Sequence, residues 1–527
     1  MSGKLHLRAL LAAAVLASAV SACSQKPLPA YGQALFIVDT DLPAAIAGRL
    51  RVDVYDENGN WYQSRDIAVP APRSWPLSFT IYNPDITQDH DALVRLRVFP
   101  DDITRDYQGE RFVDKGQTKA PAGGPGPTDD NPRLVESGVD VTPSSEPLPS
   151  VTVDQLVLVR LHLGTVGSVR VVMRGDCAGT MAMLTQAPPF QAPDITQAST
   201  CIDTEGQRVP VAEQALDPDV AIPASSQLLG TYATQDTCDP TLAPDPRAVC
   251  IPSGVFVMGS PAADITGPPD DGTPQHLAVV DGFWLDRYEV TVAQLRLALK
   301  EGILSGRLAI TFHEGPLGIP AAGDQEPEDM WCTWSAEPMG RESYAVTCTG
   351  WAALARPYCK AIGGDLPTEA QWEYAATAVG NLAKTSFPWG DGDPTCGIAV
   401  YGRSDTTLLP QGGDTVCAMM DGIGPKPVTA APTDVTALGV FGMGGGANEW
   451  VRDSIAEYGS PCWVAQPLHN PTCNDPKVTD RVIRSGSWFE GAYALNGAFR
   501  RHADAAATTI IGQAGLRCAF PKAPNQP

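Results

Sequence analysis

Twelve cysteines lie between residues 177 and 518, and one more lies near the start of the chain, at Cys23. An even set favours disulfides, which form in exported proteins and restrict how a chain folds. Zinc is the alternative, but the sequence has no CxxC pair and its seven histidines are scattered. The sequence leaves the connectivity open. The simplest expectation pairs neighbours and joins the remaining two: Cys177–Cys201, Cys238–Cys250, Cys332–Cys348, Cys396–Cys417, Cys462–Cys473 and Cys359–Cys518.

The N-terminus is typical of an export signal. A basic start precedes an apolar run over residues 9–20, which is too short to span a membrane as a helix. The stretch VSAC at residues 20–23 also resembles a bacterial lipobox, which implies cleavage before Cys23 and lipidation of its sulfur. An ordinary secretory signal, cut at the preceding alanine, is the alternative. We favour the lipoprotein, because a Pro-containing tether follows Cys23, and Ser24 fits sorting to the outer membrane of a Gram-negative cell.

The net charge of −23 excludes several kinds of partner. Nucleic-acid binding needs clustered Lys and Arg, and so does docking on an anionic lipid surface. We therefore expect no nucleic acid, and contact with a membrane only through acyl chains on Cys23. With 527 residues, of which 43% are hydrophobic, the chain is long enough for two or three domains with buried cores.

The hydrophobic pattern then divides the chain. Over residues 34–185, short segments alternate apolar with polar residues, and Asn58-Gly59 is a strong hairpin signal. This predicts an all-β sandwich, interrupted by an extended loop at about residues 115–150, that acts as a spacer or docking domain. The expected division of the chain is a signal peptide at 1–22, a tether at 23–33, the sandwich at 34–185, a Pro- and Ala-rich linker at 186–248, a second domain at 249–522 and a tail at 523–527.

The second half has a different character. Helical patterns occur at residues 290–302, 351–364 and 367–378, and Thr368 with Gln371 predicts a capping box at the start of the last. Eight of the eleven tryptophans fall between residues 331 and 488, mostly as expected core. We therefore expect an α+β domain with little regular secondary structure, held by disulfides and buried aromatic rings.

Seven motifs occur in order within this half: IPSGVFVMGS (251–260), QHLAVVDGFWLDRYEVT (275–291), GDLPTEAQWEYAA (364–376), FPWGD (387–391), GVFGMGGGANEWVRD (439–453), RVIRSGSW (481–488) and GLRCAF (515–520). Together they resemble the formylglycine-generating enzyme family, also called sulfatase-modifying factors. The resemblance covers about residues 250–522 and implies a variant of the C-type-lectin fold. It also implies a disulfide between Cys359 and Cys518.

The copper site of that family is not matched. Family enzymes oxidise a sulfatase cysteine to formylglycine with Cu(I) and oxygen, and two thiolates shortly before the GLRC position hold the metal. In this chain the equivalent stretch is residues 493–500, where Ala494 and Phe499 stand about where the sulfurs are expected. Neither side chain can ligate Cu(I), which selects soft sulfur ligands. The resemblance thus implies the fold without its known chemistry, and copper is not expected.

Calcium remains a candidate cofactor by the same resemblance. The family binds Ca²⁺ through a GN-x-W-E segment, and here Glu449 is present but Gly446 replaces the asparagine. Asp421 and the carbonyl of Ile423 are candidates for a second site. Because Ca²⁺ takes six to eight oxygens, one lost ligand need not abolish a site. The alternative is that Glu449 holds a loop through backbone N–H groups.

Other polar residues are weaker candidates. Arg500, Arg501 and His502 are adjacent and, with Glu490, are candidates to line a groove for an acidic ligand; the alternative is a solvated edge. His276 and His313 lack metal-ligand spacing, so we expect both in exposed loops.

Two functions follow from these observations. The first is a non-catalytic binding or display module on the cell envelope, a pseudoenzyme that holds a peptide, glycan or protein partner. The second is an oxidoreductase of the same superfamily that acts on a protein or small molecule through a divergent site.

Overall fold

The structure is a computed structural model, which describes most of the chain between residues 31 and 522. The export signal, Cys23, His313 and the tail lie outside the described residues. The described residues are 31–56, 61–69, 74–83, 85, 87–100, 111–113, 133–136, 139–140, 149–183, 198–202, 207–233, 238, 241, 243–244, 247–260, 272–304, 332–335, 337–381, 383–406, 412–465, 468–505 and 512–522.

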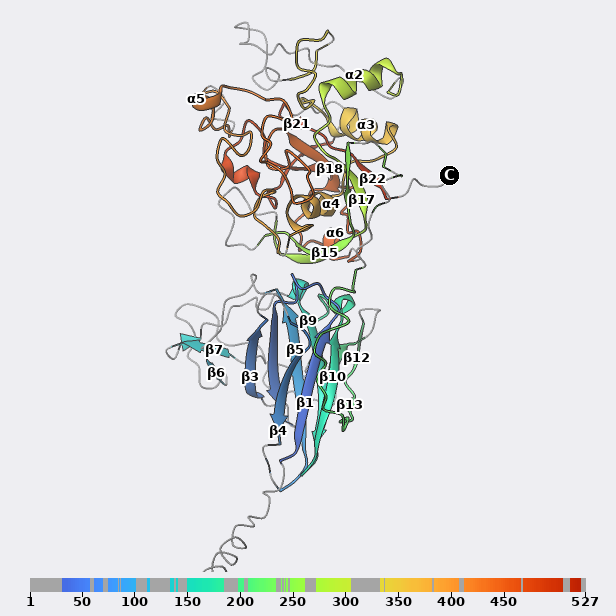
Figure 1. Ribbon diagram of the computed structural model, residues 1–527, viewed down its shortest axis with the longest axis vertical. Helices are drawn as coiled ribbons and strands as arrows, with labels where there is room; N and C mark the ends of the chain where they lie inside the picture. Colours follow the sequence, from blue (N-terminus) through green and yellow to red (C-terminus); the bar gives the residue numbers. More distant parts are fainter. Residues whose placement is uncertain are drawn as a thin grey trace, which may run out of the picture.

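The N-terminal region consists mostly of strands, and its two larger sheets lie in the lower half of Figure 1. In order, the first sheet is β10 (Val166–Met173), β1 (Gln33–Thr40), β4 (Leu77–Tyr82). The second sheet is β13 (Glu213–Gln214), β9 (Val153–Leu161), β5 (His90–Phe99), β2 (Arg49–Tyr55), β3 (Trp61–Ala68). Strand β1 pairs in parallel with β10 and antiparallel with β4, whereas the neighbours β2, β3, β5 and β9 pair antiparallel.

One hydrophobic cluster joins the two sheets. Phe36 of β1 stacks on Phe79 of β4 with ring centroids 5.0 Å apart, and Val52 and Val94 enter the same cluster from the second sheet. The alternation of apolar and polar residues in the sequence produces this arrangement, because successive side chains of a strand point to opposite faces. Strands β2 and β3 form the predicted hairpin, although its turn at Asn58-Gly59 lies outside the described residues.

Two segments contain more strand than the sequence suggested. Part of residues 186–248, expected as a linker, forms the antiparallel pair β11 (Ser199–Cys201) and β12 (Arg208–Pro210), and β13 joins the second sheet beside β9. The expected loop at 115–150 contains β7 (Arg133–Glu136) and β8 (Val139–Asp140), which form a small sheet with β6 (Arg111–Val113). Strands of two to four residues are too short for a hydrophobic period to mark them.

The C-terminal half has three small sheets and short helices around them, in the upper half of Figure 1. The sheets are β14 (Ala248–Ile251), β17 (Phe283–Asp286), β22 (Ala519–Pro521); β15 (Gly254–Met258), β16 (His276–Val280); and β20 (Arg501–Asp504), β19 (Asp480–Arg484), β18 (Asn448–Ser454), β21 (Ala514–Gly515). The helices are α2 (Val292–Lys300), α3 (Arg356–Ala361), α4 (Glu369–Glu373), α5 (Ala418–Asp421) and α6 (Pro461–Val464).

The three predicted helices are present. Helix α2 and helix α4 both begin with a capping box, the latter between Thr368 and Gln371 as predicted. A π-helical turn, Trp351–Ala355, precedes α3, and another, Tyr374–Ala378, follows α4. The helices are therefore less regular than their periodicity alone indicates.

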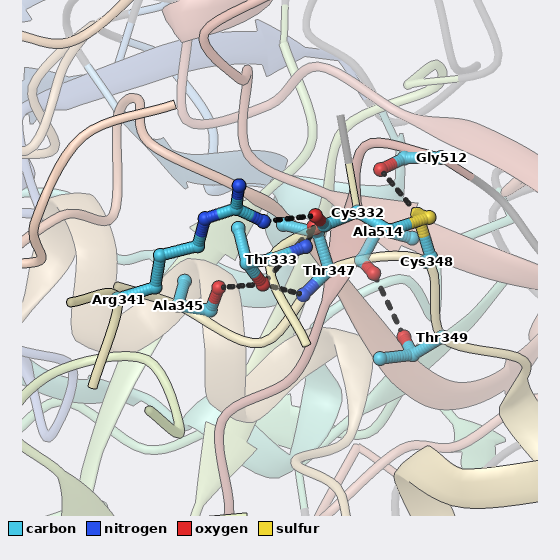
Figure 2. Close-up of a disulfide and its surroundings, with 9 residues drawn as sticks. All are labelled: Cys332, Thr333, Arg341, Ala345, Thr347, Cys348, Thr349, Gly512 and Ala514. Carbon is cyan, nitrogen blue, oxygen red and sulfur yellow. Dashed lines mark hydrogen bonds between the residues drawn. A yellow bond between two sulfur atoms is a disulfide. The ribbon is translucent and has the colours of Figure 1, made fainter. Parts of the chain in front are cut away.

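Six disulfides join the cysteines as expected, including Cys359–Cys518, which links residues 159 positions apart. Figure 2 shows how one of them is embedded. Beside the Cys332–Cys348 bridge, the Thr347 N–H donates to Thr333 Oγ1 and Thr349 Oγ1 donates to the Ala514 carbonyl of β21. The bridge thereby fixes an irregular loop against a sheet, and the set of bridges indicates an exported protein.

The two halves of the chain pack directly against one another. Val255, Leu277 and Val279 of the upper half belong to the same hydrophobic cluster as the N-terminal strands. The Ser150 hydroxyl donates to the Gln275 carbonyl across this contact. A shared apolar cluster indicates a fixed contact rather than two bodies on a loose tether. None of the described helices is both long and apolar enough to cross a membrane.

Candidate functional site

The segment over residues 485–500 links β19 to β20 and is the stretch to which the sequence motifs assign the family's chemistry. Its backbone lies between two neighbouring loops. The Gly486 N–H donates to the Gly444 carbonyl at 3.0 Å, and the Gly402 N–H donates to the Glu490 carbonyl at 2.8 Å. The segment is therefore held in one conformation by hydrogen bonds on both sides.

Apolar side chains fill the interior of this segment. Ala494 and Leu495 are buried, and Leu495 belongs to a cluster with Tyr401 and Cys417. Phe499 packs edge-on against Tyr493, with ring centroids 5.6 Å apart. The two positions that the sequence marked, Ala494 and Phe499, thus contribute packing and present no metal-ligating atom.

The thiols that a copper site requires are also missing. Every cysteine in the described residues is half of a disulfide, which leaves Cys23, near the N-terminus, as the only other cysteine in the chain. A disulfide sulfur is not the thiolate that binds Cu(I). The residues present do not fit the family's copper site.

Both ends of the segment are clamped to α4. Arg500 Nε donates to Glu369 Oε1 at 2.6 Å, and Arg484 Nη1 donates to the same oxygen at 2.9 Å. Arg484 Nη2 also donates to Glu373 Oε2 at 2.7 Å. Arg500 was expected in an open groove, but it is 8% exposed and stacks over the ring of Tyr458 at 4.3 Å. It serves the core because Glu369, in the first turn of α4, needs cationic partners when it is buried.

Glu373 shows the electrostatic effect of this clamp. Burial alone would raise the pKa of its carboxyl, but Lys384 and Arg484 outweigh burial and hold the pKa at about 2. Glu373 is thus ionised at any physiological pH and remains paired to both cations.

The other groove candidates point in different directions. Glu490 is 2% exposed, accepts a hydrogen bond from the Ser487 hydroxyl and forms an ion pair with Arg501, which is about one-third exposed. His502 is exposed and lies 2.7 Å from Asp480. The structure therefore brings Glu490 and Arg501 together, but it separates Arg500 and His502 from them.

Gly446, which replaces the family's calcium-binding asparagine, lies against a carboxyl group. Gly446 has a φ of +92°, and a Cβ atom there would lie 2.5 Å from Glu289 Oε1. A Cβ on Gly442 would lie 2.8 Å from Glu289 Oε2. The two glycines therefore leave room for Glu289, whose pKa burial raises to about 8 against the opposing effect of Arg517. Burial similarly raises the pKa of neighbouring Asp434 to about 7.

Glu449, the retained candidate ligand of the first calcium site, is bound by protein donors. Arg517 Nη2 donates to Glu449 Oε1 at 2.8 Å, and the Trp372 indole donates to Oε2 at 2.7 Å. Both the carboxylate and the guanidinium are fully buried. Glu449 thus has a structural role, which was the alternative to calcium binding. Its partners are side-chain donors rather than the expected backbone N–H groups.

The candidate oxygens of the other calcium site are held by Arg403. Its Nε donates to the Gly424 carbonyl at 2.7 Å, its Nη1 donates to the Asp421 carbonyl, and its Nη2 lies 3.5 Å from the Ile423 carbonyl. The Asp421 carboxylate also pairs with Lys426. These carbonyl oxygens therefore already have a guanidinium as their partner. Within the described residues, no group of three or more His, Cys, Asp or Glu side chains could hold a metal ion.

Most of these buried charges carry no local signal in the sequence. Glu369 carried a signal, since it follows the predicted capping residue Thr368, but its arginine partners lie more than 100 positions away. The expectation for His276 was wrong: it is the first residue of β16, and its ring packs on Tyr458 at 4.7 Å. Only long-range contacts identify such partners.

The sequence model of the Sulfatase-modifying factor enzyme 1-like domain matches residues 234–522, more than half of the chain. The chain belongs to this family. The match begins 15 residues before the boundary expected from the sequence, and so includes Cys238, whose disulfide with Cys250 ties it to β14.

Curated relatives of this family member are enzymes. Bovine formylglycine-generating enzyme is 28% identical over 269 residues, which cover 46% of this chain and 66% of that enzyme. Hercynine oxygenase of Mycolicibacterium thermoresistibile is 28% identical over 263 residues, which cover 46% of this chain and 52% of that enzyme. The chain thus spans less than two thirds of each. The solved structure of PvdO from Pseudomonas aeruginosa is 22% identical, with a TM-score of 0.40, over 55% of this chain and 99% of PvdO.

Proposed function

We propose that this family member is an exported lipoprotein whose sulfatase-modifying-factor domain binds or displays a ligand and does not oxidise cysteine. The observation that carries the proposal is the state of the sulfurs. All twelve cysteines of the described residues are consumed in six disulfides. The segment that would hold the metal is packed with Ala494, Leu495 and Phe499.

The physical argument is one of ligand chemistry. Cu(I) binds in proteins through soft ligands such as thiolate, and the reaction of the family depends on that coordination. Apolar side chains offer no lone pair, and the buried carboxylates nearby are neutralised by arginine. The domain keeps the family's architecture because the clamp on α4 and the five disulfides within residues 234–522 hold it.

The N-terminal region fits the role of a spacer in this proposal. Its two sheets share one core, as in a β-sandwich, and they pack on the sulfatase-modifying-factor domain through Val255, Leu277 and Val279. A lipidated Cys23 would anchor the chain to the cell envelope, with the sandwich holding the second domain away from the membrane. Its ligand would be a peptide, a glycan or a partner protein.

A second candidate function rests on one polar group within the same segment. Ser487, Glu490 and Arg501 form a connected constellation beside Asn448, whose Oδ1 lies 3.3 Å from Arg501 Nη1. A carboxylate held by a hydroxyl and a guanidinium could transfer a proton in an oxidoreductase with a divergent site. Glu490 is 2% exposed, which favours a structural role for this group.

The deciding experiment tests for aldehyde formation. The full chain is incubated with Cu(I) and oxygen and a peptide that carries the motif Cys-x-Pro-x-Arg, and the peptide is analysed by mass spectrometry. An established formylglycine-generating enzyme serves as the positive control. We expect the control peptide to lose its cysteine to formylglycine and the peptide exposed to this protein to remain unchanged. Aldehyde at a rate above that of Cu(I) alone would overturn the proposal.

A further inference from the structure

A large open pocket lies away from the segment over residues 485–500. It has a volume of about 980 Å³ and is bounded by the start of β17, by α3 and the turn after it, and by β22. Figure 1 places these elements together on one side of the upper half. No residue of the segment 485–500 lines it, so it is separate from the site described above.

The charge of this pocket is opposite to that of the protein. Its lining includes four cationic side chains, Arg356, Lys360, Arg452 and Lys522, but only two acidic ones. The whole chain has 37 Lys and Arg against 60 Asp and Glu. A concave surface with an excess of positive charge concentrates anions from solution.

Three of these cations share one carboxylate. Arg356 donates to Asp365 through Nε at 3.0 Å and Nη2 at 3.2 Å, Lys360 Nζ lies 2.9 Å from Asp365, and Arg452 Nε lies 3.5 Å from it. Among the described residues, Asp365 is the only acidic side chain that pairs with these three. One negative charge cannot neutralise three positive ones, so two charges remain at the pocket edge.

The geometry keeps these charges available to a ligand. Asp365 is 13% exposed, whereas the side chains of Arg356, Lys360 and Arg452 are 36%, 52% and 37% exposed. The carboxylate thus lies beneath the cations and orients them, while their outer N–H groups face solvent. Burial alone would raise the pKa of Asp365, but Arg356 and Lys360 outweigh it and hold the pKa below its usual value.

We propose that this pocket binds a small polyanion, a ligand with at least two phosphate, sulfate or carboxylate groups. Guanidinium groups bind each of these anions through paired N–H donors, and an ammonium adds a point charge. The volume exceeds that of a single inorganic anion and suits a ligand of disaccharide or nucleotide size. This inference rests on the proposed binding function and names the chemical class of its ligand.

The test is calorimetric titration of the full chain at low ionic strength. Tripolyphosphate, citrate and a trisulfated heparin disaccharide are the three probes, and they distinguish phosphate, carboxylate and sulfate as the preferred group. We expect at least one probe to bind, with an affinity that falls as salt is added. Failure of all three to bind at millimolar concentration would overturn the inference.

Matched variants locate the binding. Lys360→Gln and Arg356→Gln should each weaken the best probe about tenfold, since each removes a charge-assisted contact. Lys300→Gln, at the exposed end of α2, is the control and should bind as the wild type does. Equal loss in the control, or no loss in the pocket variants, would contradict the site.

Asp365→Asn should change the affinity for the polyanion in the opposite direction. Removing this carboxylate frees the three cations, so binding should tighten about tenfold. Weaker binding in a variant that keeps its melting temperature would contradict the proposed geometry.

If the chain forms no aldehyde and also binds no polyanion, this inference fails while the non-catalytic function stands. If it forms aldehyde, the proposed function fails whatever the titrations give.

Discussion

Arg500 and Glu369, 131 positions apart in the sequence, form two hydrogen bonds of 2.6 and 3.0 Å in the core of the C-terminal half. Glu369 occupies the first turn of α4. Arg500 is the last residue of the segment 485–500, which corresponds to the stretch that carries the copper thiolates in formylglycine-generating enzymes. Because Arg484 binds the same carboxylate from the other end, the segment is fixed at both ends to one helix. Its conformation therefore depends on these buried charges.

The clamp should be essential to stability. Arg500→Ala leaves Glu369 with one cation fewer in a dry environment, and removal of one partner from a buried pair costs roughly 3–5 kcal/mol. We expect the urea concentration at the unfolding midpoint, measured by tryptophan fluorescence, to fall clearly. Arg160→Ala is the matched control, because Arg160 pairs with Asp89 and Asp91 at the surface and contributes at most about 1 kcal/mol. Equal effects of the two substitutions would show that the clamp is not structural.

The disulfides should differ in their contribution to stability. The Cys359–Cys518 bridge closes a far longer loop than Cys238–Cys250, with separations of 159 and 12. By chain-entropy arguments its removal should cost about 2 kcal/mol more. Paired Cys→Ser variants of each bridge, compared by thermal unfolding, test this order. A greater loss for the short bridge would contradict it.

The sequence predicted the framework of the protein better than its site. Strand alternation, the capping box at Thr368 and five of the six cysteine pairs depend on residues close together in the chain, and the structure contains them. Arg500 was misplaced because a cation beside Arg501 looks solvated until its distant partner Glu369 is known. The strands β11 and β13 were missed because they are too short to show a period.

Membrane attachment should depend on one sulfur. In a Gram-negative host, the wild-type chain should fractionate with membranes, and Cys23→Ser should move it to the soluble exported fraction, because the described residues contain no membrane-spanning helix. Ser24→Ala, one residue away, is the control and should remain with membranes. Continued membrane retention of Cys23→Ser would contradict lipid anchoring.

Chelation should leave the protein unchanged. Arg403 holds the carbonyls of Asp421, Ile423 and Gly424, so EDTA should shift the melting temperature by less than about 1 °C, and added calcium should not raise it. Arg403→Ala removes that guanidinium and should cost about 2–4 kcal/mol. Arg170→Ala, an exposed arginine, is its control. A fall of several degrees in EDTA would show that calcium binds despite the arginine.

The carboxyl of Glu289 should make stability depend on pH. Its pKa is about 8 in the folded chain against a usual 4.5, so the folded state holds a proton that the unfolded state has lost between these values. Stability from this group is thus complete below about pH 4.5 and is lost as the pH rises to about 8. Glu289→Gln mimics the protonated form at every pH. Relative to wild type, it should be neutral at pH 4.5 and more stable at pH 8.5, by at most roughly 5 kcal/mol.

The measurement is urea unfolding of both proteins at several pH values. Glu457→Gln, at an exposed position, is the matched control and should follow the wild type throughout. Asp434, whose pKa is about 7, will retain part of the pH dependence in the Glu289 variant. A difference between Glu289→Gln and wild type that stays constant from pH 4.5 to 8.5 would show that Glu289 does not carry the proton. Such a result would assign the proton to Asp434, whose carboxylate accepts hydrogen bonds from the N–H groups of Gly444 and Gly445.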